Sequence, residues 1–122
     1  MSYINMKKKF EDRQHETMVR VLKNYLEDKE YKVKIEPDTL EYAGFKADLE
    51  ATKGKESLCF EIVNGKNIDT NKIKEKWESI SGNRDCEFCL FVPKNKEREV
   101  KELLDKWAIY FRKLWIYSPE SL

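Results

Sequence analysis

The spacing of apolar residues along the chain predicts alternating helices and strands. Residues 10–29 place apolar side chains at helical intervals with charged side chains on the other face, which predicts an amphipathic helix. Residues 31–35 alternate apolar and charged positions, as a half-buried strand does. A second strand is expected over residues 45–52, and the Lys-Gly-Lys sequence at 53–55 is typical of a hairpin turn.

The second half of the chain alternates buried strands with helices. Two almost unbroken apolar runs, residues 57–63 and 86–92, are typical of strands that are covered on both faces. Asp69 or Thr70 can cap the helix that follows the first run. The remaining elements are two helices and a last strand, over residues 70–81, 95–107 and 109–117.

The predicted order is helix, three strands, helix, strand, helix, strand. Hairpin-linked strands come first and strands linked by helices come later, which predicts an α/β fold with a mixed central sheet and helices on both faces. The chain has 122 residues, no internal repeat and no Pro- or Gly-rich linker, so we expect a single domain. Residues 1–9 are expected to be a flexible basic segment ahead of it.

Composition excludes several classes of protein. Apolar residues make up 40% and charged residues 39% of the chain, which is too apolar for a disordered chain and too charged for a membrane-spanning one. No apolar run of a secretory signal follows the start, so a cytoplasmic protein is expected. The formal net charge of +1 argues against binding nucleic acid by bulk positive charge, although a local basic face stays compatible with it.

The three cysteines predict core residues rather than a metal or redox site. Cys59, Cys86 and Cys89 are an odd, sparse set, which favours a reducing environment over a disulfide framework. Cys86 and Cys89 have the spacing of a zinc or redox motif, but positions three apart in a strand point to opposite faces. We therefore expect reduced thiols in the core.

Glu61 is the residue that most strongly suggests chemistry, because it is a charge inside an otherwise apolar strand. Burying a carboxylate is costly unless a cation or strong donors compensate. The hairpin brings Asp48 of the preceding strand beside Glu61, and two close carboxylates repel unless a divalent ion such as Mg²⁺ or Mn²⁺ lies between them. The alternative is a solvated Asp48 and a Glu61 that is satisfied by a lysine or by backbone donors.

The chain resembles the PD-(D/E)xK nuclease superfamily, in a layout similar to that of small archaeal Holliday-junction resolvases. The resemblance lies in the leading helix, a strand, Ala47-Asp48, the hairpin and the run from Phe60 to Gly65. It implies a restriction-endonuclease-like fold in which Asp48, Glu61 and the backbone carbonyl of Ile62 hold Mg²⁺ or Mn²⁺. The bound metal would activate water for attack on a phosphodiester.

The sequence departs from the family motif at two positions. Ala47 stands where proline is usual, and Val63 stands where the motif lysine is expected. Strand alternation places Val63 on the same face as Glu61, so no shift of register restores the lysine. A lysine that stabilises charge on the phosphate would have to come from elsewhere in the chain.

Other residues could complete such a site. For the missing lysine we expect Lys46 or Lys66 first, with Lys72 or Lys76 reaching from the next helix as alternatives. The family also takes a carboxylate from the first helix, for which Glu16 is our choice, whereas the spacing of the apolar stripe favours His15. An ordinary surface role is the alternative for each of these residues.

Two functions from different classes follow. The first is a metal-dependent endonuclease that acts on DNA, with branched or structured DNA among its substrates and a homodimer to supply the two sites that cutting both strands needs. The second is an inactive nuclease-like module for nucleic-acid binding or protein assembly. Val63 favours the second function, and the pairing of Asp48 with Glu61 favours the first. A third alternative is that both carboxylates are purely structural.

Overall fold

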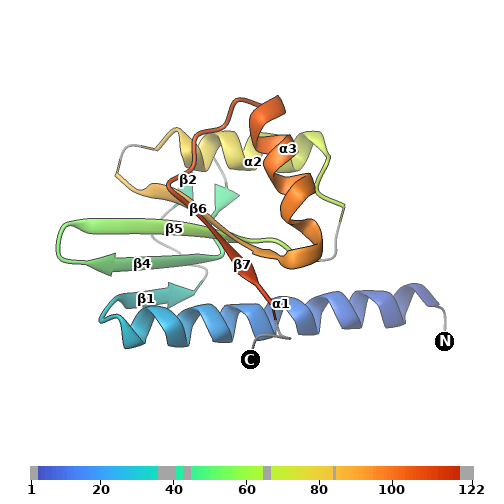
Figure 1. The fold of residues 1–122 in the computed structure, drawn as a ribbon, viewed down its shortest axis with the longest axis horizontal. Coiled ribbons are helices and arrows are strands. Elements are labelled where there is room, and N and C mark those ends of the chain that lie inside the picture. The colour runs from blue at the N-terminus through green and yellow to red at the C-terminus, as the bar shows by residue number, and fades with distance from the viewer. Residues whose placement is uncertain (1–2, 36–40, 43–44, 65–66, 84, 119–122) are drawn as a thin grey trace.

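The computed structural model describes residues 3–35, 41–42, 45–64, 67–83 and 85–118. A five-stranded sheet in the order β1-β4-β5-β6-β7 forms its centre (Figure 1). The strands of this sheet are β1 Lys32–Ile35, β4 Leu49–Lys53, β5 Glu56–Ile62, β6 Glu87–Pro93 and β7 Lys113–Tyr117. A separate pair of short strands, β2 Glu41–Tyr42 and β3 Phe45–Lys46, forms a small antiparallel ladder.

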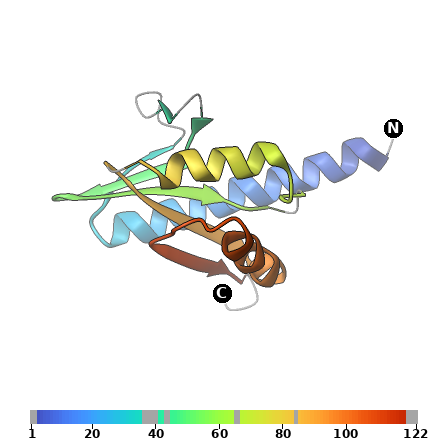
Figure 2. The ribbon, with the colours of Figure 1, turned by 90° about the horizontal axis from the view of Figure 1, so that it is seen from above.

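Three α-helices cover the two faces of the sheet. Helix α1 (Tyr3–Asp28) lies on one face, and α2 (Asn71–Ser81) and α3 (Glu97–Lys106) lie on the other (Figures 1 and 2). A short 3-10 helix, η1 (Lys94–Lys96), precedes α3. In the described part of the chain no helix is both long and apolar enough to cross a membrane.

The sheet is mixed, as the sequence predicts. The pairs β1–β4 and β4–β5 are antiparallel, and β4 turns into β5 at Gly54, whose φ of +60° suits a glycine. The pairs β5–β6 and β6–β7 are parallel, and α2 and α3 make the two crossovers. The α/β class, the mixed sheet and the helices on both faces are therefore confirmed.

Two predicted boundaries are wrong for identifiable reasons. Helix α1 begins at Tyr3 and not at Phe10, because residues 3–9 contain neither proline nor glycine to stop the helix. The predicted strand 45–52 is interrupted between β3 and β4, where the N–H of Asp48 donates to the Phe60 carbonyl at 3.0 Å and the chain bends. Lys46 therefore lies in a different sheet from Glu50.

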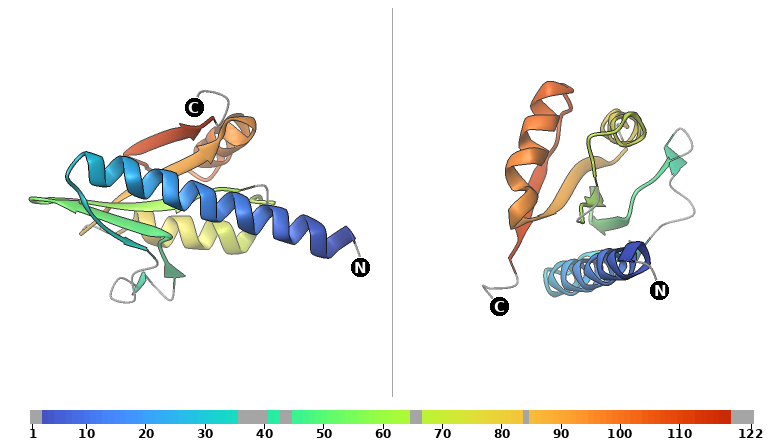
Figure 3. Two further views of the ribbon diagram at one scale, coloured as in Figure 1. Left: turned by 90° about the horizontal axis from the view of Figure 1, so that it is seen from below. Right: turned by 90° about the vertical axis from the view of Figure 1, so that its right-hand side faces the viewer.

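Strand β5 divides its side chains between two hydrophobic clusters. Leu58, Phe60 and Ile62 pack toward α1, whose buried residues there include Met18 and Leu22. Cys59 and Val63 belong to the cluster beneath α2 and α3, as alternation in a strand requires. Glu61 lies between Phe60 and Ile62 in sequence, so it points to the α2 side of the sheet. Figure 3 shows α1 and the pair α2 and α3 on opposite sides of the strands.

Candidate functional site

A pocket of about 180 Å³ lies at the carboxyl end of β5, beside α2. Five segments contribute to it: α1, the bend before β4, the end of β5, the chain between β5 and α2, and α2. Its polar lining consists of His15, Asp48, Glu61, Asn64, Asn67 and Lys76. The pocket therefore brings together the two carboxylates that the sequence analysis paired.

Asp48 is held against β5 by two backbone contacts. The β4–β5 ladder ends at the pair Leu49–Phe60, and Asp48 lies in the bend just before β4. The N–H of Asp48 donates to the Phe60 carbonyl at 3.0 Å, and the N–H of Ile62 donates to Asp48 Oδ2 at 2.8 Å. These bonds hold the Asp48 side chain at the same end of β5 as Glu61.

Glu61 is a buried acid that the described residues satisfy only in part. The residue is 4% exposed, and its Oε1 lies 3.0 Å from the Nζ of Lys76. Its Oε2 is buried and has no hydrogen-bond partner among the described residues. Burial, and then the charge of Asp48, raise the pKa of Glu61 to about 8, and Lys76 offsets only part of this rise.

Lys76 reaches the acid pair because of the way α2 is set on the sheet. Thr70 caps the helix through its Oγ1, which accepts a hydrogen bond from the N–H of Ile73 at 3.2 Å. Of the two predicted capping residues, Asp69 and Thr70, the structure therefore shows Thr70. Lys76 follows Ile73 by three residues, which places both on the helix side that borders the pocket. Trp77, the next residue, is buried in the core and holds α2 in place.

The structure changes the choice of the replacement lysine. Lys46 is exposed and does not line the pocket, because the bend at Asp48 separates it from β4. Lys66 lies outside the described residues. Lys76, which the sequence analysis held only as an alternative, contacts Glu61 directly. Lys76 lies beside the apolar stripe of α2, which indicates that it can reach the sheet. Lys72 also lies beside this stripe, so the sequence pattern alone does not distinguish the two lysines.

The first helix contributes His15 rather than Glu16. His15 precedes the fully buried Met18 by three residues, so it lies on the face of α1 that meets the sheet, and it lines the pocket. Glu16 is exposed and does not line the pocket, because one residue further along a helix turns the side chain by about 100°. The choice of Glu16 is therefore corrected to His15.

The donor set fits a small divalent ion. Mg²⁺ commonly binds through one or two carboxylates and keeps several waters. Asp48 and Glu61 supply two carboxylates, and Oε2 of Glu61 has no protein partner among the described residues. The described residues hold no cluster of three His, Cys, Asp or Glu side chains suited to a metal, so further ligands would have to be backbone or water oxygens. Ile62 lines the pocket, and a metal contact of its carbonyl stays a prediction.

The cysteines differ from the expectation of three reduced thiols. Cys59 and Cys86 form a disulfide with a Cα–Cα distance of 6.0 Å. It links β5 to the residue before β6, on the α2 side of the sheet. Cys86 and Cys89 do lie on opposite faces, as predicted, and burial raises the pKa of the free Cys89 thiol to about 12. Spacing along the chain could not reveal that Cys59 and Cys86 meet across neighbouring strands.

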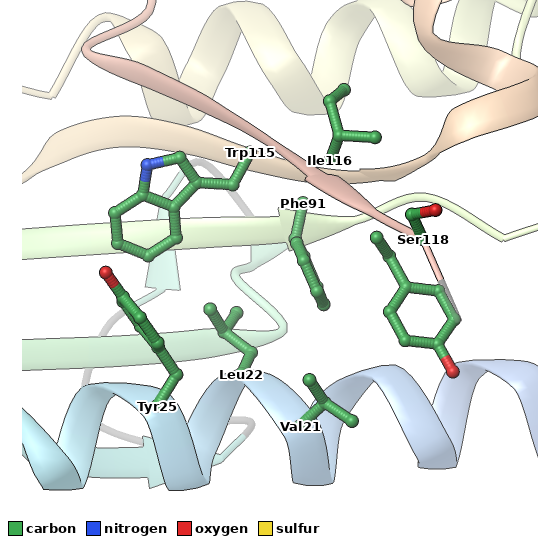
Figure 4. Close-up of a pocket in the computed structure, with 8 residues that line it drawn as sticks. Val21, Leu22, Tyr25, Phe91, Trp115, Ile116 and Ser118 are labelled. Carbon is green, nitrogen blue, oxygen red and sulfur yellow. The ribbon is translucent and has the colours of Figure 1, made fainter. Parts of the chain in front are cut away.

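A larger hollow of about 400 Å³ lies between α1 and β7 (Figure 4). Its lining is aromatic and aliphatic, with Tyr25, Phe91, Trp115 and Tyr117 among its residues. Among the described residues that line it, none carries a carboxylate, an imidazole or an amine. The smaller pocket around Glu61 is the candidate site.

Comparison with known proteins gives the chain no relative. No protein-family model matches it, and no curated protein or solved structure is significantly similar to it.

Proposed function

We propose that this protein is a metal-dependent nuclease with a restriction-endonuclease-like fold, which hydrolyses phosphodiester bonds in DNA. Asp48 and Glu61 would bind Mg²⁺ or Mn²⁺. The observation that carries the proposal is the buried Glu61, whose Oε2 has no partner among the described residues and which lines the same pocket as Asp48. A second acid beside a buried one raises the free energy of the metal-free site, and a divalent cation removes that cost.

The residues around the pair support hydrolysis of a phosphodiester. When bound, the metal ion would supply an activated water and neutralise charge on the phosphate. The N–H of Ile62 fixes Asp48 at 2.8 Å, which orients one carboxylate before any ligand arrives. Lys76 would replace the motif lysine, for which Val63 offers no charge, because the Lys76 ammonium already contacts Glu61. His15 borders the same pocket and is within reach as a proton carrier.

The substrate we propose is DNA, including branched or otherwise structured DNA, with two copies of the chain supplying one site for each strand. A homodimer would let two identical pockets act on the two strands of one duplex. The near-zero net charge means that the DNA contact would be local to the surface around the pocket.

An inactive nuclease-like module is the second candidate function. The contact between Lys76 and Glu61 at 3.0 Å favours it, since a protein ammonium already compensates part of the buried charge without a metal. Such a module would bind nucleic acid or assemble with an active partner, and Asp48 and Glu61 would serve only the structure.

Cleavage assays with matched variants separate the two candidates. Purified protein is incubated with labelled four-way junction, linear duplex and single-stranded DNA, with Mg²⁺, Mn²⁺ or EDTA. We expect cleavage that depends on the metal and falls by about a hundredfold or more in Asp48→Asn and Glu61→Gln. Glu75→Gln, which alters an exposed carboxylate of α2 outside the pocket, should cleave as the wild type does.

The metal site has a second measurement that does not depend on turnover. Mn²⁺ should raise the melting temperature of the wild type through linkage, and Asp48→Asn should abolish the rise. Cleavage that persists in Glu61→Gln at the wild-type rate would contradict the nuclease proposal. Mn²⁺ stabilisation without cleavage of any DNA substrate would favour the inactive module.

A further inference from the structure

The Lys76 side chain contacts Glu61 and is more exposed to solvent than the acid. It is 23% exposed, whereas the Glu61 side chain is 6% exposed, and their charged atoms are 3.0 Å apart. Lys76 comes from α2 and Glu61 from β5, so this contact joins the helix layer to the sheet. A ligand that binds Glu61 therefore meets a carboxylate that already contacts the Lys76 ammonium.

We propose that Lys76 is a resident cation of the acid pair, which competes with the divalent ion for Glu61 and leaves Glu61 when that ion binds. The inference rests on the proposed metal site and adds a regulation to it. In the metal-free protein, Lys76 compensates the buried carboxylates and keeps α2 docked over the end of β5. Once released, its ammonium lies at the pocket mouth, where a phosphate would arrive.

Geometry makes the two cations competitors. Oxygen ligands of Mg²⁺ lie about 2.0–2.1 Å from the ion, so an ion on Glu61 would sit within a few Å of an ammonium that touches the same carboxylate. Like charges at that distance in a partly desolvated pocket repel strongly. Oε1 carries the Lys76 contact and Oε2 does not, so an ion bound at Oε2 would share the carboxylate with the ammonium and weaken its hold on Oε1.

Neighbouring lysines of α2 do not share this position. Lys72 is exposed, and neither Lys72 nor Lys74 lines the pocket around Glu61. Lys74 is two residues from Lys76 on the same helix, and a step of two residues turns a side chain by about 200°. Lys74 is therefore a matched control: it has the same charge and the same helix, but it points away from the acid pair.

Mn²⁺ binding in the absence of DNA tests the inference. The dissociation constant is measured from the electron paramagnetic resonance signal of free Mn²⁺, for the wild type, Lys76→Met, Lys76→Arg and Lys74→Met. We expect Lys76→Met to bind Mn²⁺ about tenfold more tightly or better, since the competing charge is gone. Lys76→Arg keeps the charge and should stay within about threefold of the wild type, as should Lys74→Met. Circular dichroism checks that each variant is folded, and Lys76→Gln replaces Lys76→Met if the latter fails to fold.

Activity gives an independent second readout. Lys76→Met should lose about a hundredfold in metal-dependent cleavage while it binds Mn²⁺ more tightly, a combination that a purely structural role would not produce. Unchanged or weaker Mn²⁺ binding in both Lys76→Met and Lys76→Gln would overturn the competition and leave the metal site standing. Absence of Mn²⁺ binding in the wild type, or binding that survives in Asp48→Asn, would overturn the proposed metal site and this inference with it.

Discussion

The two faces of the central sheet are built from the same strands but carry different chemistry. Toward α1, β5 presents Leu58, Phe60 and Ile62 to an apolar cluster. Toward α2, the same strand presents Cys59, Glu61 and Val63. Glu50, the other buried charged residue of the described part, also lies on the α2 side, since its strand neighbours Leu49 and Ala51 face α1. Both faces are therefore packed, but only the α2 face combines this packing with buried charge.

This difference separates stability from chemistry within one strand. Residues that follow each other in β5 serve opposite layers, so a substitution at Phe60 and one at Glu61 act on different properties although their Cα atoms are neighbours. The α2 face accepts a buried carboxylate at its end, where the pocket admits solvent and Lys76 compensates charge. The α1 face offers no such compensation and stays apolar.

Phe60→Ala should have the largest effect on stability. Phe60 of β5 is fully buried against α1 and Trp115. The centroids of the Phe60 and Trp115 rings lie 5.3 Å apart. Removal of the Phe60 ring leaves a cavity, and we expect the free energy of unfolding to fall by about 3–5 kcal/mol in urea denaturation. A loss of less than about 1 kcal/mol would show that the α1 face is not the main stabilising core. Any residual folded protein should still respond to Mn²⁺, because the acid pair lies on the other face.

Loss of the disulfide should weaken the α2 face by a somewhat smaller amount. Cys59 and Cys86 are 27 residues apart in sequence, and closing a loop of that length stabilises the folded state by about 3 kcal/mol in the chain-entropy account. The double variant Cys59→Ser, Cys86→Ser should lose about this much in urea denaturation. A reducing agent should lower the stability of the wild type and leave the double variant unchanged. Equal effects of the reductant on both proteins would count against the pairing.

A change of pH should alter the stability of the α2 face by less than either of these substitutions does. Burial and Asp48 raise the pKa of Glu61 from 4.5 to about 8, so the folded state holds more protons than the unfolded state between these values. Stability therefore falls as pH rises through this window in metal-free protein. We expect a fall of about 2 kcal/mol, less than the full shift implies, because water that enters the pocket weakens the effect of burial.

Urea denaturation at pH 5 and pH 8 measures this dependence. Glu61→Gln should remove the fall, since its amide does not titrate in this range. Glu75→Gln, at an exposed position on α2, should keep it. A wild-type stability that rises from pH 5 to pH 8 would mean that Lys76 outweighs burial and that Glu61 is ionised throughout.

Much of the fold followed from short-range pattern. Helical spacing located α1, α2 and α3, and the two apolar runs located β5 and β6, because a regular element repeats its buried face at a constant period. The same periodicity placed Cys86 and Cys89 on opposite faces and Glu61 with Val63. The start of α1 and the break between β3 and β4 were missed, because neither carries a strong hydrophobic signal.

Only the part of the candidate site whose residues lie close together in the sequence could be predicted. The hairpin brings Asp48 and Glu61 into one pocket through a few residues of chain, so this pairing followed from the turn. His15 and Lys76 come from helices that are remote in sequence, and the disulfide joins two strands linked by α2. These contacts depend on how far each helix is rotated and shifted on the sheet, which residue spacing alone does not specify.

The order of the α-helices and of the strands in the five-stranded sheet, its mixed character and the pairing of two acids were determined by the sequence itself, because alternation and turn chemistry act over a few neighbouring residues. Only the tertiary structure decided which cation meets Glu61 and which cysteines join. Packing of Trp77 and Ile80 against the sheet sets the rotation of α2, and that rotation brings Lys76 rather than Lys72 to the pocket. The physical reason is that a long side chain takes its partner from the docking of whole elements, whereas strand neighbours are set by the backbone between them.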